Sequence, residues 1–151
     1  QQIELGFNYR MTDIQAALGL SQMQRLDEFV SKRHAIAKRY DKAFKGLPTT
    51  LPWQHPDSWS SYHLYPIRIK QNESNATQRQ VYDAMQMENI NVNLHYIPVY
   101  RQPYYEVMGF NAGYCPDAEQ YFQETLSIPI YPTLTESEQA KVIRVICEII
   151  A

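Results

Sequence analysis

The sequence has 151 residues and a net charge of −2, and 44% of its residues are hydrophobic, 20% charged and 13% aromatic. These proportions are typical of a globular protein with a hydrophobic core and exclude an intrinsically disordered chain. The chain contains neither a basic block nor an apolar run of the roughly 20 residues that span a membrane, so we expect neither nucleic acid nor a membrane as a partner.

The first predicted element is a long helix that begins after Thr12. Thr12 and Gln15 have the spacing of a capping box, and apolar residues recur at helical spacing as far as Phe44. The first stop signal is Gly46, so a continuous helix over 13–45 would be about 50 Å long. A compact domain of this size has a radius of gyration of only about 15 Å. The helix must therefore kink, protrude or cross to a second body, and we favour the crossing.

The rest of the chain predicts a small α+β unit over 47–151, which begins with a loop rich in Pro, Trp and Ser over 47–61. Strands are expected where apolar residues alternate with polar ones or cluster, over 62–69, 90–94 and 126–130. Helices are expected over about 78–88, 103–108, 116–124 and from Thr135 to the C-terminus, two of them opened by the capping boxes Thr77/Gln80 and Thr135/Glu138. The predicted fold class is therefore α+β, with a long helix before a three-stranded unit.

Few residues indicate chemistry by themselves. Asn8 and Arg10 stand in a polar loop before a helix, where an amide, a guanidinium and backbone N–H groups could hold a phosphate. A capped loop with one surface arginine explains the same residues. His95 follows a predicted strand and precedes Tyr96, so it could be a general acid or base or a ligand-binding group, although a lone histidine is more often structural.

The cysteines and tyrosines give weaker signals. Cys115 and Cys147 do not have the spacing of a metal site, so we expect no metal and, with reduced thiols as the default, a cytoplasmic protein. Twelve tyrosines indicate either packing with a wet hydroxyl edge or a pocket for a polar ligand such as a sugar or nucleotide. The residues alone show no complete active site.

Four ordered segments resemble those of one enzyme family. The run from Gly6 to Ala17 is similar to the signature of the DegT/DnrJ/EryC1/StrS family of sugar aminotransferases. Further segments follow in the family's order, namely YHLY at 62–65, HYIPVY at 95–100 and LSIPIYP at 126–132. The resemblance is strongest to the enzymes of pseudaminic acid synthesis, which aminate C4 of a UDP-linked 4-keto-6-deoxy sugar.

The resemblance implies the fold of a pyridoxal 5′-phosphate (PLP)-dependent transferase of the aspartate aminotransferase type. Residues 1–46 would complete an active-site loop of a large domain and form a bridging helix, and 47–151 would form the C-terminal small domain with a three-stranded antiparallel sheet. The lysine that binds the cofactor covalently is expected upstream of Gln1, because every lysine in this chain lies in the wrong context. We therefore expect no catalytic residue in this chain and no activity from it alone.

The resemblance also implies a homodimer with active sites shared between subunits. It assigns Asn8 to the phosphate of PLP in the partner subunit, and Arg10, His95 and Tyr96 to the nucleotide-sugar substrate. The second substrate would be an amino-acid donor, glutamate by family habit. Two alternatives stay open: a PLP-dependent sugar dehydratase of the same family, and a non-catalytic module that binds a sugar nucleotide or dimerises.

Overall fold

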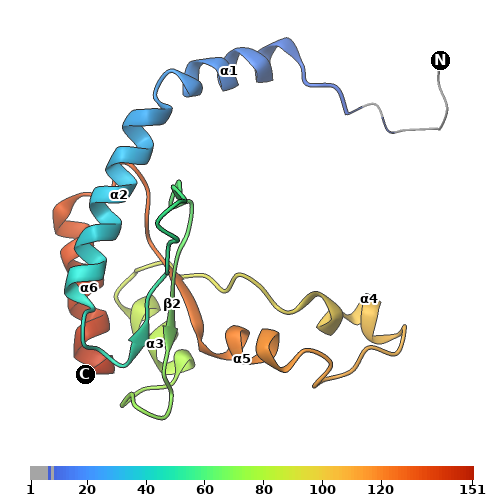
Figure 1. The fold of residues 1–151 in the computed structure, drawn as a ribbon, viewed down its shortest axis with the longest axis vertical. Coiled ribbons are helices and arrows are strands. Elements are labelled where there is room, and N and C mark those ends of the chain that lie inside the picture. Colours follow the sequence, from blue (N-terminus) through green and yellow to red (C-terminus); the bar gives the residue numbers. More distant parts are fainter. Residues whose placement is uncertain (1–6, 8) are drawn as a thin grey trace.

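The computed structural model describes residues 7 and 9–151. Its helices are α1 (Asp13–Met23), α2 (Leu26–Ala43), α3 (Gln78–Met87), α4 (Pro103–Glu106), α5 (Pro116–Glu124) and α6 (Glu136–Ile150), with a 3₁₀ turn at Val99–Arg101. Its strands are β1 (Thr49–Thr50), β2 (Tyr65–Ile69) and β3 (Thr125–Ile128). The predicted α+β class is confirmed, and two arms, one carrying α1 and the other α4, extend from the body that holds the sheet (Figure 1).

The sheet is antiparallel, with β2 between β1 and β3. The predicted strand at 90–94 is wrong, because this segment forms only an isolated bridge between Asn93 and Ser127. The side chain of Asn93 accepts the backbone N–H of Leu94 at 2.8 Å, and this local bond competes with a longer ladder. The third strand is instead β1, inside the segment that was predicted to be a loop.

The long predicted helix is divided into α1 and α2 at Gln24 and Arg25. The backbone N–H of Arg25 bonds to the carbonyl of Gln22, three residues back, which tightens the turn and ends the regular helix. None of the α1 residues is buried, whereas α2 buries Ile36, Ala37 and Tyr40. The helix therefore both kinks and protrudes, and its crossing to a second body stays a prediction.

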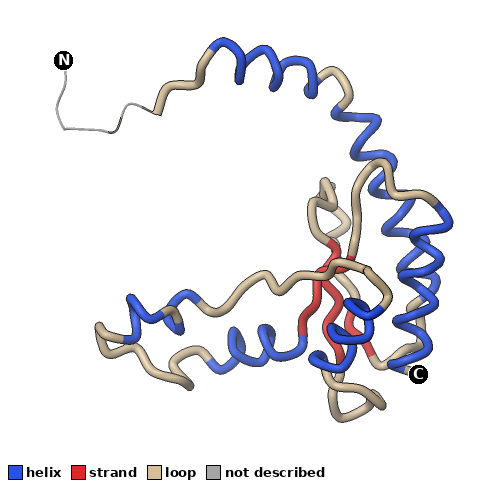
Figure 2. Tube along the Cα trace, turned by 180° about the vertical axis from the view of Figure 1, so that it is seen from behind, coloured by secondary structure: helices blue, strands red, loops and turns tan. Residues whose placement is uncertain are grey.

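The core lies between the sheet and the helices α2, α3 and α6. Figure 2 shows α2 and α6 running side by side along one flank of the sheet. The rings of Tyr40 and Phe44 stack with centroids 5.5 Å apart, and the ring of Tyr65 lies 5.1 Å from that of Tyr40. The Tyr40 hydroxyl donates to the carbonyl of Pro129 at 2.8 Å, so α2 is bonded to the segment after β3. Burial raises the pKa of the Tyr40 hydroxyl, which therefore stays protonated and able to donate.

The local predictions for the helices are confirmed. Each of the three predicted capping boxes is formed, at Thr12/Gln15, Thr77/Gln80 and Thr135/Glu138. Short-range hydrogen bonds decide these helix starts, so neighbouring residues suffice to predict them. None of the helices in the described part of the chain is long and apolar enough to cross a membrane.

A carboxylate holds the arm of α4 to α5. Glu119 Oε1 accepts the hydroxyl of Tyr100 at 2.6 Å and the backbone N–H of Gly113 at 2.8 Å, and Arg101 lies 3.8 Å away. The hydrogen bonds from Tyr100 and Gly113, with the charge of Arg101, lower the pKa of Glu119 below its usual value of 4.5. The base of the arm is therefore fixed by a group that is ionised at neutral pH.

We predict that Ile67→Ala lowers the free energy of unfolding by about 2–5 kcal/mol, because it leaves a cavity in the central strand. The Ile67 side chain has no exposed surface, whereas that of the control residue, Val107, is 84% exposed. The measurement is urea denaturation of both variants and the unchanged chain. An equal effect of Val107→Ala would contradict this account of the core.

We predict that acid loosens the arm through Glu119. Because the pKa of Glu119 is lowered in the folded state, its contribution is present above pH 4.5 and lost as pH falls through the folded pKa. The loss of unfolding free energy between pH 6 and pH 3 should therefore be smaller for Glu119→Gln than for the unchanged chain. Glu73→Gln, in an exposed pair with Lys70, serves as the control and should keep the full acid dependence.

Candidate functional site

The structure brings His95 and Tyr96 together at the end of the sheet. Nδ1 of His95 lies 2.9 Å from Oγ of Ser127, a buried residue of β3. The rings of His95 and Tyr96 meet edge to face with centroids 4.8 Å apart, and the Tyr96 side chain is 72% exposed. The serine therefore fixes the orientation of the imidazole, while the tyrosine remains open to a ligand.

A hollow of about 240 Å³ lies beside His95. Its walls come from the segment before β2, from 91–93, and from β3 with the residues that follow it. His63 and Ser127 line it together with His95, so two imidazoles and a hydroxyl face one small space. Such groups can donate and accept hydrogen bonds and can hold a proton, which suits a polar ligand. We call this hollow the His63–His95 pocket.

Sequence reasoning missed two of these lining residues. Neither His63 nor Ser127 was assigned a role from the sequence. The signal for His63 was its place inside the YHLY segment, whose partner segments contain His95 and Ser127. Asn93 and Ser127 are far apart in the sequence, and their pairing brings the segment that carries His95 to β3.

Arg33 of α2 holds two walls of the pocket in place. Its Nη1 points at the carbonyls of Tyr62 (2.9 Å), His63 (3.2 Å) and Ile130 (3.1 Å). Tyr62 has a positive φ of 45°, which is unusual for any residue with a Cβ atom. The guanidinium therefore stabilises a strained turn that presents His63, and it ties that turn to the chain after β3.

Arg10, a third predicted site residue, lies elsewhere. Arg10 is exposed and precedes α1, on the arm that leads away from the sheet (Figure 1). The structure thus does not bring Arg10 to His95 and Tyr96 within one copy of the chain. Asn8 lies outside the described residues.

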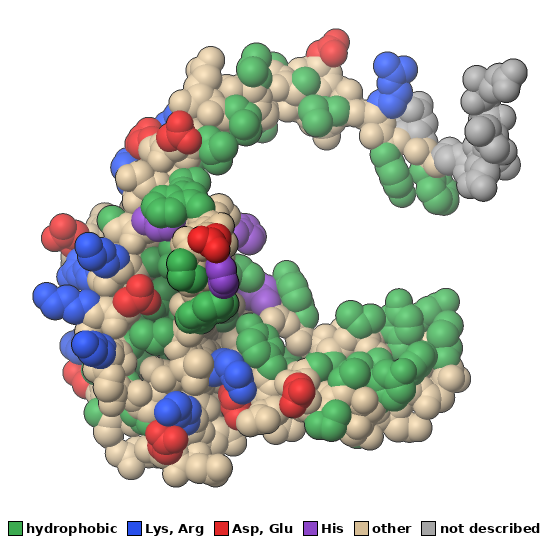
Figure 3. All heavy atoms as spheres, viewed as in Figure 1, with side chains coloured by type: hydrophobic (Ala, Val, Ile, Leu, Met, Phe, Trp, Pro, Cys, Tyr) green, Lys and Arg blue, Asp and Glu red, His purple; other side chains and the backbone are tan. Residues whose placement is uncertain are grey.

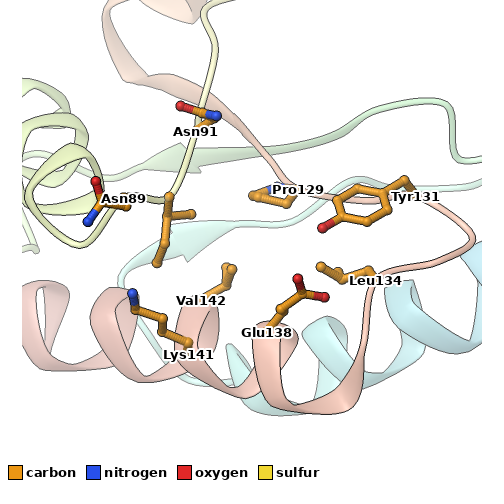
Figure 4. A pocket seen from close by; sticks show the side chains of 9 residues that line it. Asn89, Asn91, Pro129, Tyr131, Leu134, Glu138, Lys141 and Val142 are labelled. Atoms are coloured by element: carbon orange, nitrogen blue, oxygen red, sulfur yellow. The ribbon is translucent and has the colours of Figure 1, made fainter.

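A larger hollow of about 490 Å³ is less suited to be the site (Figure 4). Figure 4 shows Lys141 pointing toward Asn89, and Glu138 toward Tyr131. The Lys141 ammonium donates to the Glu88 carbonyl at 2.5 Å, and the Glu138 carboxylate accepts the backbone N–H of Thr135 at 2.8 Å. Its charged groups are therefore engaged within the chain and are not free to bind a ligand.

No lysine lines the His63–His95 pocket. The lysines of the chain are Lys32, Lys38, Lys42, Lys45, Lys70 and Lys141. Within residues 7 and 9–151, no cluster of three His, Cys, Asp or Glu side chains is placed to hold a metal ion. The described residues can therefore bind and orient a polar ligand, but they do not supply an amine for covalent chemistry at this pocket.

Hydrophobic side chains gather along the inner side of both arms in Figure 3. The two arms carry hydrophobic residues that are more than 60% exposed, among them Tyr9, Ile14 and Leu18 on the α1 arm and Val99, Tyr104 and Val107 on the α4 arm. Extended apolar patches of this kind mark surfaces that bind other proteins or further domains. Both arms therefore carry surface of a type that another polypeptide normally covers.

Comparison with known proteins gives one consistent result. The model of the DegT/DnrJ/EryC1/StrS aminotransferase family matches residues 1–147. The spore coat polysaccharide biosynthesis protein SpsC of Bacillus subtilis (strain 168) is 35% identical over 148 residues, which are 96% of this chain and 38% of SpsC. The chain thus spans less than two-fifths of the length of this relative.

Solved structures agree with the sequence match. PseC of Helicobacter pylori, an aminotransferase involved in pseudoaminic acid biosynthesis, has a TM-score of 0.86 and 28% identity, over 99% of this chain and 40% of PseC. The PLP form of Spr1654 from Streptococcus pneumoniae, a putative sugar aminotransferase, has a TM-score of 0.84 and 27% identity, over 94% of this chain and 37% of Spr1654. Both superpose on this chain with only part of their own length.

We predict that Arg33→Met loosens the wall of the pocket, because three carbonyls lose their donor. These bonds are part-buried or exposed, so each contributes about 0.5–1.5 kcal/mol, and amide hydrogen exchange over 61–65 should accelerate when they are lost. Arg39→Met is the matched control on the same helix, since Arg39 binds the Glu136 carbonyl and the Gln139 side chain. Equal exchange at 61–65 in the two variants would show that Arg33 has no special role there.

Proposed function

Because the chain belongs to the DegT/DnrJ/EryC1/StrS aminotransferase family, we propose that it is the C-terminal part of a PLP-dependent aminotransferase that acts on a nucleotide sugar. The observation that carries this proposal is the family match over residues 1–147, in a chain that covers only 38% of its relative SpsC. Residues 1–46 are proposed to belong to the bridging helix and the active-site loop before it, and 47–151 to the small domain.

The division of labour between the domains follows from the residues present. PLP, when bound, supplies the electron sink for amino-group transfer, and a lysine of the preceding domain is proposed to hold it. This chain is proposed to bind and orient the substrates, which matches a pocket rich in hydrogen-bonding groups and without lysine. The chain alone should therefore have no transaminase activity.

His95 and Tyr96 are proposed to bind the nucleotide sugar. His95 has one ring nitrogen at hydrogen-bond distance from Ser127, so its other nitrogen is left to hold or donate a proton to a ligand oxygen. Tyr96 offers an exposed hydroxyl and ring face beside it. Together they suit the hydroxyl and phosphate oxygens of such a substrate better than an apolar ligand.

Asn8 and Arg10 are proposed to act across the interface of a homodimer. Asn8 would bind the PLP phosphate of the partner subunit, and Arg10 would face the substrate phosphates there, which a guanidinium can bind in a bidentate manner. The position of Arg10, exposed on an arm that leads away from His95, supports a role in another copy's site. The apolar inner side of the arms supplies surface for such a dimer.

The substrate is proposed to be a UDP-linked 4-keto-6-deoxy sugar, aminated at C4, with glutamate as the donor. The similarity to PseC, over 99% of this chain, supports this choice within the family. The test is to incubate the full-length protein with PLP, glutamate and the keto sugar, and to identify the product by mass spectrometry. An amino sugar supports the aminotransferase, whereas a product that has lost a hydroxyl identifies a dehydratase of the same family.

We predict that Asn8→Ala in the full-length protein raises the dissociation constant of PLP about 10- to 150-fold, the worth of one charge-assisted hydrogen bond. Equilibrium dialysis with PLP measures this without turnover. Asn72→Ala, in a polar turn after β2, is the control and should leave the constant unchanged. A PLP affinity that Asn8→Ala does not alter would remove Asn8 from the site.

Mixed dimers test the partner assignment of the same residue. One subunit would carry Asn8→Ala, and the other would lack the cofactor-binding lysine. If Asn8 acts across the interface, one of the two sites keeps both groups and binds PLP normally. If Asn8 acts within its own subunit, neither site is complete and PLP affinity falls.

A further inference from the structure

A second hollow, of about 540 Å³, adjoins the His63–His95 pocket. It contains both tryptophans of the chain, Trp53 and Trp59, and Leu64 lines this hollow as well as the pocket. The side chains of Trp53 and Trp59 are 80% and 75% exposed. We call this hollow the Trp groove, and the shared Leu64 shows that it lies next to the pocket proposed for the substrate.

The ring of Trp59 is held by α2. It stacks on the imidazole of His34 with centroids 3.9 Å apart and planes inclined by 14°. The Nε2–H of His34 donates to the carbonyl of Ser60 at 2.8 Å, which fixes the imidazole itself. Since one face of the indole lies on His34 and the side chain is still 75% exposed, the opposite face is open. Trp59 is therefore a rigid platform for a second ring.

The loop between the two tryptophans is closed by its own hydrogen bonds. Gln54 Nε2 donates to the carbonyl of Ser58 at 2.7 Å, and Gln54 Oε1 accepts the N–H of Ser60 at 3.2 Å. The Ser58 hydroxyl donates to the carbonyl of His55 at 2.8 Å, and His55 Nδ1 accepts the N–H of Asp57 at 3.1 Å. These bonds keep the loop in shape without a ligand and occupy most of its polar side-chain atoms.

This chemistry favours one part of a nucleotide sugar over the others. A sugar ring needs free hydrogen-bond partners for its hydroxyls, and the loop has engaged most of its own. A phosphate needs cations, and neither lysine nor arginine lines the groove. A planar base needs mainly an aromatic face, and base–aromatic stacking is a common mode of nucleotide binding. The groove therefore suits the base, and the adjoining histidine pocket suits the more polar part of the ligand.

We propose that the Trp groove is a stacking subsite for the nucleobase of the nucleotide-sugar substrate, with Trp59 as its platform. The proposal rests on the proposed function, since it places one part of the same ligand. The nucleotide would extend from the groove past Leu64 to the His63–His95 pocket, where the sugar lies, and the phosphates between base and sugar would meet Arg10 of the partner subunit, as proposed above. Trp59 is thus a binding residue and takes no part in the chemical step.

The test measures binding of UDP to the full-length protein by calorimetry, without turnover. Trp59→Leu should weaken UDP about 5- to 150-fold, the range of one base–aromatic stack, while Trp59→Phe retains most of the affinity. Inorganic pyrophosphate, which has no base, should bind equally to all variants. Tyr114→Leu, an exposed aromatic residue on the α4 arm, is the control and should bind UDP normally.

Several results would overturn the subsite. Unchanged UDP affinity in Trp59→Leu would do so, as would an equal loss for UDP and pyrophosphate, which would indicate a structural role. A loss for UDP-N-acetylglucosamine but not for UDP would place the sugar in the groove. Iodide that fails to quench Trp59 fluorescence would show that the rest of the protein covers it. If the protein without any substitution binds no UDP, the proposed function is refuted, and the subsite with it.

Discussion

The attachment of α2 to the sheet is the interaction on which the rest of the structure depends. Its buried face packs on the core through Tyr40, whose hydroxyl binds the carbonyl of Pro129. About two turns earlier on the same helix, His34 and Arg33 bind the loop before β2, and Arg33 also reaches Ile130. A single helix therefore holds two walls of the His63–His95 pocket and the platform of the Trp groove.

This attachment also explains why an unusual turn persists. The positive φ of Tyr62 costs free energy that a free loop would release by relaxing. Three carbonyls bound by Arg33 and the edge contact of Tyr62 with His34 hold the turn as it is. Strain retained beside a pocket is typical of sites whose geometry is selected for binding. The direction of α2 and the shape of the pocket are therefore coupled.

The open architecture fits a binding domain whose chemistry is completed by other polypeptide. Two arms expose large apolar side chains, and the described residues that line the His63–His95 pocket include two imidazoles and a hydroxyl but no lysine. In the proposed enzyme, the cofactor belongs to the preceding domain, and this chain holds the substrate against it.

The sequence by itself determined the three helix starts with capping boxes and most helix spans of the small unit, because capping and periodicity act between near neighbours. It did not reveal the position of the kink at Arg25, where no glycine or proline marks a break. It also did not reveal that Thr49–Thr50, and not the predicted segment 90–94, forms the third strand of the sheet. Only the tertiary structure decided that His63, His95 and Ser127 share one pocket and that Arg33 holds its walls. Those contacts join segments far apart in the chain, and their geometry is set by how whole elements pack, which no local pattern encodes.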